Sequence, residues 1–162
     1  MSDGSPPDIA GWKAKLIGRL AHSYFAVARG MTIGVRAACF DAEGRVFLVK
    51  HSYVPGWHMP GGGLERRETA ADALSKELRE EGNLAILGRP QLFHVYFNKA
   101  ASNRDHVLFY RVDVEQTSPR APDREIVECG FFPMDKLPVG TTPATLRRLA
   151  ELRGEASPAN HW

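Results

Sequence analysis

The sequence predicts a mixed α+β domain, and three observations support this fold class. The chain has 162 residues, which is about the length of one domain and enough to bury a core without disulfides or zinc. Apolar residues make up 43% and charged residues 25%, as in ordinary globular proteins and unlike disordered or fibrous ones. Short β-prone runs are mixed with a few helical patterns, without internal repeats or strict strand-helix alternation.

The first 24 residues contain a tail and an amphipathic pattern. Residues 1–8 are expected to form a flexible N-terminal tail. Over residues 9–24 apolar side chains recur at three- and four-residue spacing, which predicts a helix that packs on its own domain or forms a homodimer. The start of the chain lacks the basic and apolar regions of a secretory signal, so we expect a cytoplasmic protein.

The remaining elements follow from alternating apolar runs and turn residues. Runs at 31–40 and 46–50, joined by a turn with Asp41 and Gly44, predict a hairpin. We expect residues 154–162 to form a C-terminal tail, which leaves a single domain over residues 9–153. The later elements are a helix at 70–81, strands around 91–97, 107–114 and 126–132, and a closing helix at 142–153.

Charge and cysteine content exclude several kinds of partner. The net charge is +2, from 21 basic and 19 acidic residues, which is too balanced to indicate a surface for nucleic acid or membrane. Cys39 and Cys129 lie among apolar residues and form no CxxC pair, so we expect buried free thiols. The histidines show no helical i, i+4 pair and are interpreted as structural or peripheral: His51, His58, His94 and His106.

The expected helix at 70–81 has clear boundary signals. Thr69 and Asp72 fit a capping box at its start. Gly82 and Asn83 are the residue types that best tolerate the left-handed conformation at a helix end.

Glutamates lie on the apolar side of this helix. On a helical wheel Glu77 and Glu81 fall inside the apolar stripe and Glu80 lies at its edge, so we expect these carboxylates to face inward rather than form a solvated face. Carboxylates three or four residues apart lie about 6 Å from each other, and each like-charge pair costs about 3 kcal/mol at an effective dielectric near 20. A cation would neutralise them, and all-oxygen ligands suit Mg²⁺ or Mn²⁺.

A glycine loop precedes the helix. Gly61, Gly62 and Gly63 allow the backbone to approach a ligand closely and to aim peptide groups at a metal or phosphate. Three glycines alone are also typical of a tight turn. Next to the glutamates, the loop favours phosphate chemistry with a divalent ion.

The loop and helix together resemble a known family motif. From Gly62 the sequence reads Gly-x5-Glu68-x7-Lys76-Glu77-Leu78-x-Glu80-Glu81-x-Asn83-Leu84, which resembles the Nudix box. Lys76 stands where that family usually has Arg, and Asn83 where it usually has Gly. Gly56-Trp57, Pro60-Gly61 and the segment 131–138 extend the resemblance over roughly residues 30–140.

The resemblance implies a Nudix fold, a mixed β-sheet sandwiched between α-helices, and a set of site residues. Glu80 and Glu81 would be the principal metal ligands, the Gly61 carbonyl a further ligand, and Glu77 a ligand or the general base. Glu125 is the expected downstream acidic ligand, with Glu128 as its rival. Glu68 and Lys76 would support the metal site, and Trp57 and Arg66 would contact the substrate.

The implied activity is that of a pyrophosphohydrolase dependent on Mg²⁺ or Mn²⁺. Water would attack phosphorus in the diphosphate linkage of a small nucleoside diphosphate derivative, such as ADP-ribose, or of a nucleoside triphosphate. Two alternatives stay open: a non-catalytic Nudix-like ligand sensor, and an enzyme that trims RNA ends, which would need a basic groove. Further substrate-contact candidates are Tyr53, Phe93, Phe97 and Arg67.

Overall fold

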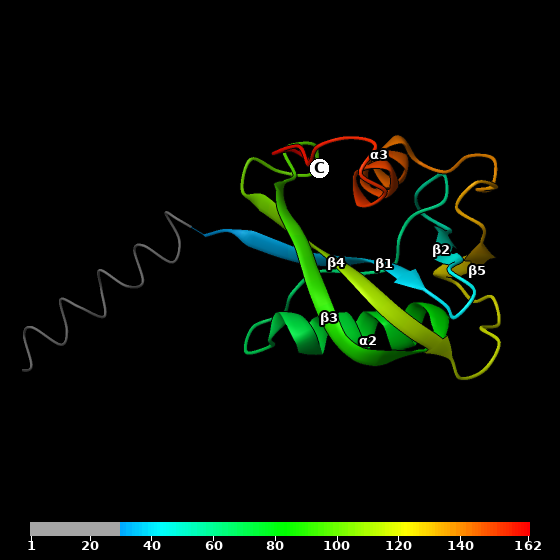
Figure 1. The fold of residues 1–162 in the computed structure, drawn as a ribbon. Coiled ribbons are helices and arrows are strands. Elements are labelled where there is room, and N and C mark those ends of the chain that lie inside the picture. The colour runs from blue at the N-terminus through cyan, green and yellow to red at the C-terminus, as the bar shows by residue number, and fades with distance from the viewer. Residues whose placement is uncertain (1–29) are drawn as a thin grey trace, which may run out of the picture. The chain divides into compact units, whose positions relative to one another are not determined.

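The computed structural model describes residues 30–162, so the expected tail at 1–8 and helix at 9–24 lie outside the described residues. Neither helix of this described part is long and apolar enough to cross a membrane. The elements are β1 (Thr32–Phe40), β2 (Val46–His51), α2 (Ala70–Gly82), β3 (Leu84–Phe97), β4 (Asp105–Gln116), β5 (Ile126–Phe132) and α3 (Pro143–Leu152) (Figure 1).

The strands form one mixed sheet in the order β3-β4-β1-β2-β5. β1 and β4 are parallel, and every other neighbouring pair is antiparallel, including the predicted hairpin of β1 and β2. Helices α2 and α3 lie on opposite sides of the sheet (Figure 1), and each packs on its own buried cluster. The predicted fold class, a mixed sheet between helices, is confirmed.

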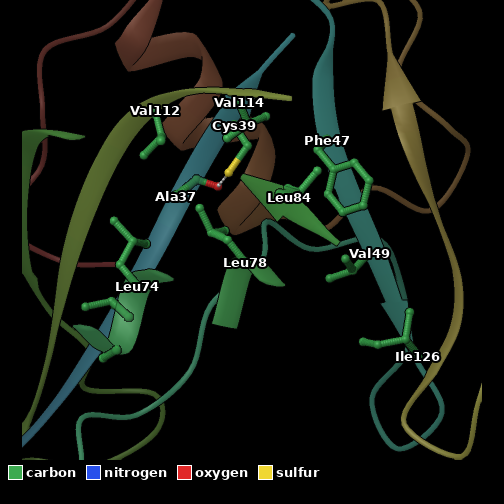
Figure 2. Packing of buried hydrophobic residues seen from close by; sticks show 12 residues of the cluster. Ala37, Cys39, Phe47, Val49, Leu74, Leu78, Leu84, Val112, Val114 and Ile126 are labelled. Carbon is green, nitrogen blue, oxygen red and sulfur yellow. Dashed lines mark hydrogen bonds between the residues drawn. The ribbon is translucent and has the colours of Figure 1, made fainter. Parts of the chain in front are cut away.

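The α2 face of the sheet contains the larger apolar cluster. Ala37 and Cys39 of β1 both point to this face because side chains alternate along a strand. Leu74 and Leu78 of α2 are fully buried and point toward these strands (Figure 2). Cys39 and Cys129 are both free thiols, as predicted. Cys39 is buried as expected, whereas Cys129 is only half-buried.

Helix α2 begins and ends at the predicted signals. The Thr69 hydroxyl accepts a hydrogen bond from the Asp72 N–H (3.1 Å), and the Asp72 carboxylate accepts one from the Thr69 N–H (3.3 Å). At the other end Asn83 adopts a left-handed conformation with φ 52°. The predicted range of 70–81 is therefore correct to within one residue.

Strand β3 is longer than predicted, because it begins at Leu84 rather than near residue 91. Gly88 has a φ of +73°, Pro90 follows it, and the pairing with β4 shifts between Leu87 and Gln91. Glycine and proline weaken a strand pattern, and here they mark an irregular ladder within one long strand.

The expected C-terminal tail at 154–162 contacts the domain through its last three residues. The Trp162 N–H donates to the Phe97 carbonyl (3.1 Å), and the Phe97 N–H donates to the Asn160 carbonyl (2.9 Å). The Arg148 Nη1 donates to the His161 carbonyl (2.9 Å). The partners of this segment are remote in sequence, which explains why its composition alone indicated a tail.

Arg148 is fully buried and joins α3 to β3 and to the C-terminal segment. Its Nη2 lies 2.6 Å from Glu151 Oε1, and Glu151 Oε2 accepts a hydrogen bond from the Tyr96 hydroxyl (2.6 Å). The guanidinium stacks 4.1 Å from the centre of the Tyr96 ring and 5.5 Å from that of Trp162. Pairing and stacking together compensate the buried charge.

We predict that Trp162→Ala lowers the free energy of unfolding by about 2 kcal/mol. The substitution removes a ring that lies 5.5 Å from Tyr96 and 5.7 Å from Phe109, and it uncovers the Arg148 guanidinium. Urea denaturation followed by circular dichroism measures the change. Val139→Ala, at a fully exposed side chain, is the control and should shift stability by less than about 0.5 kcal/mol. Equal stabilities of the two variants would contradict the packed C-terminus.

Candidate active site

The glycine loop lies against β1, backbone to backbone. The Val35 N–H donates to the Gly62 carbonyl (2.8 Å), and the Ala37 N–H donates to the Pro60 carbonyl (3.0 Å). Gly61 lies between these two bonds with a φ of +139°, and a side chain there would collide with the Val35 carbonyl oxygen. Only glycine allows this conformation and this close approach.

Glu81 of α2 is the carboxylate that joins the helix to the loop. Its side chain is 7% exposed, and Oε2 accepts a hydrogen bond from the Gly61 N–H (2.8 Å). Oε1 lies 3.5 Å from Nε2 of His51, at the end of β2. Glu81 therefore faces inward as predicted, and His51, interpreted from the sequence as structural or peripheral, lies next to it.

Burial controls the ionisation of this pair. Burial raises the pKa of Glu81 to about 7, and the negative charges of Glu77 and Glu125 add to the effect, while Arg36 and the Gly61 N–H oppose it. Burial also lowers the pKa of His51 to about 4, with the charge of Arg36 acting in the same direction. Near pH 6 the neutral forms of both groups are therefore favoured.

Glu77 lies one helical turn before Glu81 and is half-buried. Its carboxylate lies over Gly62, because a Cβ on that glycine would contact both Glu77 carboxylate oxygens. Burial is the largest cause that raises the pKa of Glu77, and the charge of Lys76 opposes it. Two inward carboxylates thus meet the glycine loop, as the wheel predicts.

Glu80 differs from these two. Its side chain is 59% exposed, and Oε1 lies 4.0 Å from Nη2 of Arg79. The expectation that it faces inward is wrong, because one residue along a helix turns the side chain by about 100°, away from the stripe that Glu81 shares.

Glu125, rather than its rival Glu128, lies on the side of the acidic pair. Its carbonyl accepts a hydrogen bond from the N–H of Ser52 (2.9 Å), the residue after His51. In addition to burial, the charge of Glu125 contributes to the raised pKa of both Glu77 and Glu81. Glu128 pairs instead with Lys50 across the sheet, at 3.9 Å.

Lys76 joins the helix to the loop on its outer side. Its Nζ lies 3.0 Å from Glu68 Oε1 and 3.3 Å from Glu65 Oε1. Glu68 also accepts a hydrogen bond from the Glu65 N–H (2.9 Å). Lys76 thus bridges two carboxylates as a point charge, without the planar fork of arginine.

Only some of the residues predicted to contact substrate are exposed near the site. Trp57 is 5% exposed and packs edge-on against Phe132, so its ring is in the core and has no free face for stacking. Arg66 is exposed in the loop and forms no hydrogen bond or ion pair within residues 30–162. Among the aromatic candidates, Tyr53 is 69% exposed and lies 5.0 Å from the His51 ring.

Arg36 is the residue that sequence reasoning missed. It lies on β1, and its Nη1 donates a hydrogen bond to the Met59 carbonyl (3.2 Å), in the chain segment that leads to the glycine loop. The signal in the sequence was a single basic residue inside the apolar run 33–40. Charged residues are rare at such positions unless they are paired or functional.

The donor set fits a divalent cation. Within residues 30–162, no three His, Cys, Asp or Glu side chains already gather closely enough to hold a metal by themselves. Mg²⁺ does not need such a cage, since it commonly binds one or two carboxylates, waters and substrate phosphates. The buried Glu81, with a raised pKa and with Glu77 as a like-charged neighbour, is the kind of group that a cation would stabilise.

Comparison with known proteins identifies the family of the region that contains these residues. A family model described as the NUDIX domain matches residues 30–152. Phosphatase NudJ of Escherichia coli strain K12 is 33% identical over 101 residues, which cover 59% of this chain and 64% of that protein. The chain therefore matches slightly less than two thirds of the length of this relative.

Two solved structures have the same fold. A MutT NUDIX hydrolase from Burkholderia pseudomallei is 26% identical, with a TM-score of 0.63, over 75% of this chain and 97% of that chain. An ADP-ribose pyrophosphatase from Streptococcus suis is 25% identical, with a TM-score of 0.59, over 81% of this chain and 95% of that chain.

We predict that Gly61→Ala lowers the free energy of unfolding by at least about 3 kcal/mol, because the added methyl combines a clash with a strained φ. Gly63→Ala is the matched control, since a Cβ there has no neighbour within 4 Å among the described residues. Urea denaturation of both variants measures the difference. A Gly61→Ala protein as stable as Gly63→Ala would refute the close packing of the loop on β1.

We predict that Glu81→Gln stabilises the metal-free protein at pH 8 but not at pH 5. The pKa of Glu81 is about 7 in the folded protein and about 4.5 in the unfolded chain. Between these values the folded protein binds more protons, so this group lowers stability as the pH rises. The stability difference between variant and wild type should grow by about 3 kcal/mol over that range. Urea denaturation in EDTA measures it, with Glu43→Gln in the exposed hairpin as control; a pH-independent difference would contradict the raised pKa.

Proposed function

Because this chain belongs to the Nudix hydrolase family, we propose that it is a divalent-metal-dependent pyrophosphohydrolase that acts on a nucleoside diphosphate derivative. The observation that supports this proposal best is the buried Glu81 carboxylate, which is bound to the Gly61 N–H and lies next to Glu77 and the glycine loop. Carboxylates beside a close-approaching backbone suit a cation that also binds phosphate.

The proposed metal ligands come from α2, the loop and the segment before β5. Glu80 and Glu81 are the principal ligands and the Gly61 carbonyl is a further one, with Glu125 downstream. The Glu80 carboxylate is 59% exposed, so a cation can reach it from solvent. When bound, Mg²⁺ or Mn²⁺ neutralises charge on the diphosphate and lowers the pKa of a water molecule.

Glu77 is the proposed general base. A water oxygen forms a bond to phosphorus, the anhydride P–O bond breaks, and the Glu77 carboxylate takes the proton of the water. Burial raises the pKa of Glu77, which makes its carboxylate a stronger base than one in solution. For a substrate with a single diphosphate linkage, each of the two products carries one phosphate group.

One structural relative is an ADP-ribose pyrophosphatase, so ADP-ribose is the first compound to assay. Other nucleotide sugars and nucleoside triphosphates follow, because the box would bind the diphosphate while other residues select the attached group. Tyr53, exposed beside His51, is the proposed residue for stacking on a base or sugar.

The alternative is a non-catalytic ligand sensor with the same fold, since a fold does not determine function. Lys76 in place of arginine is the feature that favours it. The retained Glu77, Glu80 and Glu81 favour catalysis, because a sensor has no need for a base beside a metal site.

We predict that the wild-type protein cleaves at least one compound of a nucleoside diphosphate panel only with Mg²⁺ or Mn²⁺. Phosphate released by a coupled phosphatase reports the new monoesters. Glu80→Gln and Glu81→Gln should each lower turnover by at least about 100-fold, because each removes a charged metal ligand. Glu43→Gln, in the exposed hairpin, is the control for the loss of one acidic side chain.

Two outcomes would contradict the proposal. Unchanged turnover in folded Glu80→Gln and Glu81→Gln proteins would overturn the metal assignment. No cleavage of any compound, with ligand binding still detectable by calorimetry, would favour the sensor.

A further inference from the structure

Arg36 lies on β1 directly beside the glycine loop. The hydrogen bonds of Val35 to Gly62 and of Ala37 to Pro60 flank it on both sides, so Arg36 lies opposite Gly61. The backbones are in close contact, since a Cβ on Gly61 would lie 2.9 Å from the Arg36 Cα. The backbone of Arg36 is thus fixed relative to the loop that would carry a metal ligand.

The guanidinium of Arg36 has N–H donors that bind no partner among the described residues. Its Nη1 donates to the Met59 carbonyl at 3.2 Å, whereas a guanidinium has five N–H donors. Within the part of the chain that the structure describes, Arg36 forms no ion pair and the side chain is half-buried. The nearby lysines differ, because Lys76 is bound by Glu65 and Glu68 and Lys50 lies 3.9 Å from Glu128.

The positive charge of Arg36 reaches the acidic pair. It opposes the effect of burial on the pKa of Glu77 and of Glu81. Burial is the largest cause of the lowered pKa of the neighbouring His51, and the charge of Arg36 is the next largest. The guanidinium is therefore within electrostatic range of the carboxylates without being bound to them.

We propose that Arg36 is a substrate-binding residue that holds the diphosphate of the substrate at the glycine loop. This inference rests on the proposed function. A half-buried guanidinium with unused donors suits a phosphate group, which it binds with two parallel N–H···O bonds.

A purely structural role would give a different pattern of defects. If Arg36 only supported the Met59 carbonyl and the loop, its replacement would lower stability and metal affinity together. If it binds phosphate, substrate affinity falls while stability and metal affinity persist. Arg36→Lys separates these roles further, because lysine keeps a charge and a donor but loses the planar fork.

The test compares wild type with Arg36→Gln and Arg36→Lys, and with Arg111→Gln as control. Arg111 lies on the neighbouring β4 and pairs with Asp113 at 3.2 Å. Calorimetry with α,β-methylene ADP and Mg²⁺ measures diphosphate binding, and electron paramagnetic resonance measures Mn²⁺ binding without substrate. Arg36→Gln should weaken analogue binding and raise KM by about 10- to 100-fold, with Arg36→Lys in between. Mn²⁺ affinity and the urea midpoint should not fall below those of wild type. For Arg111→Gln all values should stay near wild type.

The outcomes distinguish this inference from the function on which it rests. Analogue affinity and KM within twofold of wild type in Arg36→Gln would overturn the inference and leave the hydrolase intact. Parallel losses of Mn²⁺ affinity and stability in both Arg36 variants would also overturn it, in favour of a structural role. A wild-type protein that neither cleaves the panel nor binds the analogue would overturn the proposed function, and this inference with it.

Discussion

The hydrogen bond from the Gly61 N–H to the Glu81 carboxylate, at 2.8 Å, is the contact on which the arrangement of the site depends. It fixes α2 relative to a loop that is itself hydrogen-bonded to β1. The helix, the loop and the sheet are therefore held in one arrangement. Gly61 fits there because it has no side chain, and Glu81 is held inward by the apolar stripe of its helix. The same geometry places Glu77 over Gly62 one turn earlier.

This arrangement carries an electrostatic cost in the metal-free protein. Burial and like charges raise the pKa of Glu81, and burial lowers that of His51, so neither group is easily charged. Glu81 and His51 lie 3.5 Å apart, and two neutral groups at this distance attract each other less than an ion pair would. A buried carboxylate with a strongly raised pKa beside a like-charged neighbour is the pattern expected of a functional site.

Local signals made much of the fold predictable, while long-range pairing hid the rest. The boundaries of α2 follow from Thr69, Asp72 and Asn83, which act within one helical turn, and the inward turn of Glu81 follows from helical periodicity. The first half of β3 was missed because Gly88 interrupts its pattern, and the C-terminal segment because its partners are remote. Arg36 has no local signature of its role, since its importance arises from the loop that lies opposite it.

The exchange of arginine for Lys76 within the box becomes understandable from the charges around the loop. Lys76 contacts Glu65 and Glu68 at 3.3 Å and 3.0 Å, and a point charge is sufficient to bridge two carboxylates. It acts on Glu77 only through its field, which opposes the effect of burial on the pKa of that carboxyl. A planar fork matters most where two oxygens of one anion are bound at once. In this chain Arg36 supplies a guanidinium beside Gly61, so the planar fork that would bind a phosphate group comes from β1 rather than from position 76.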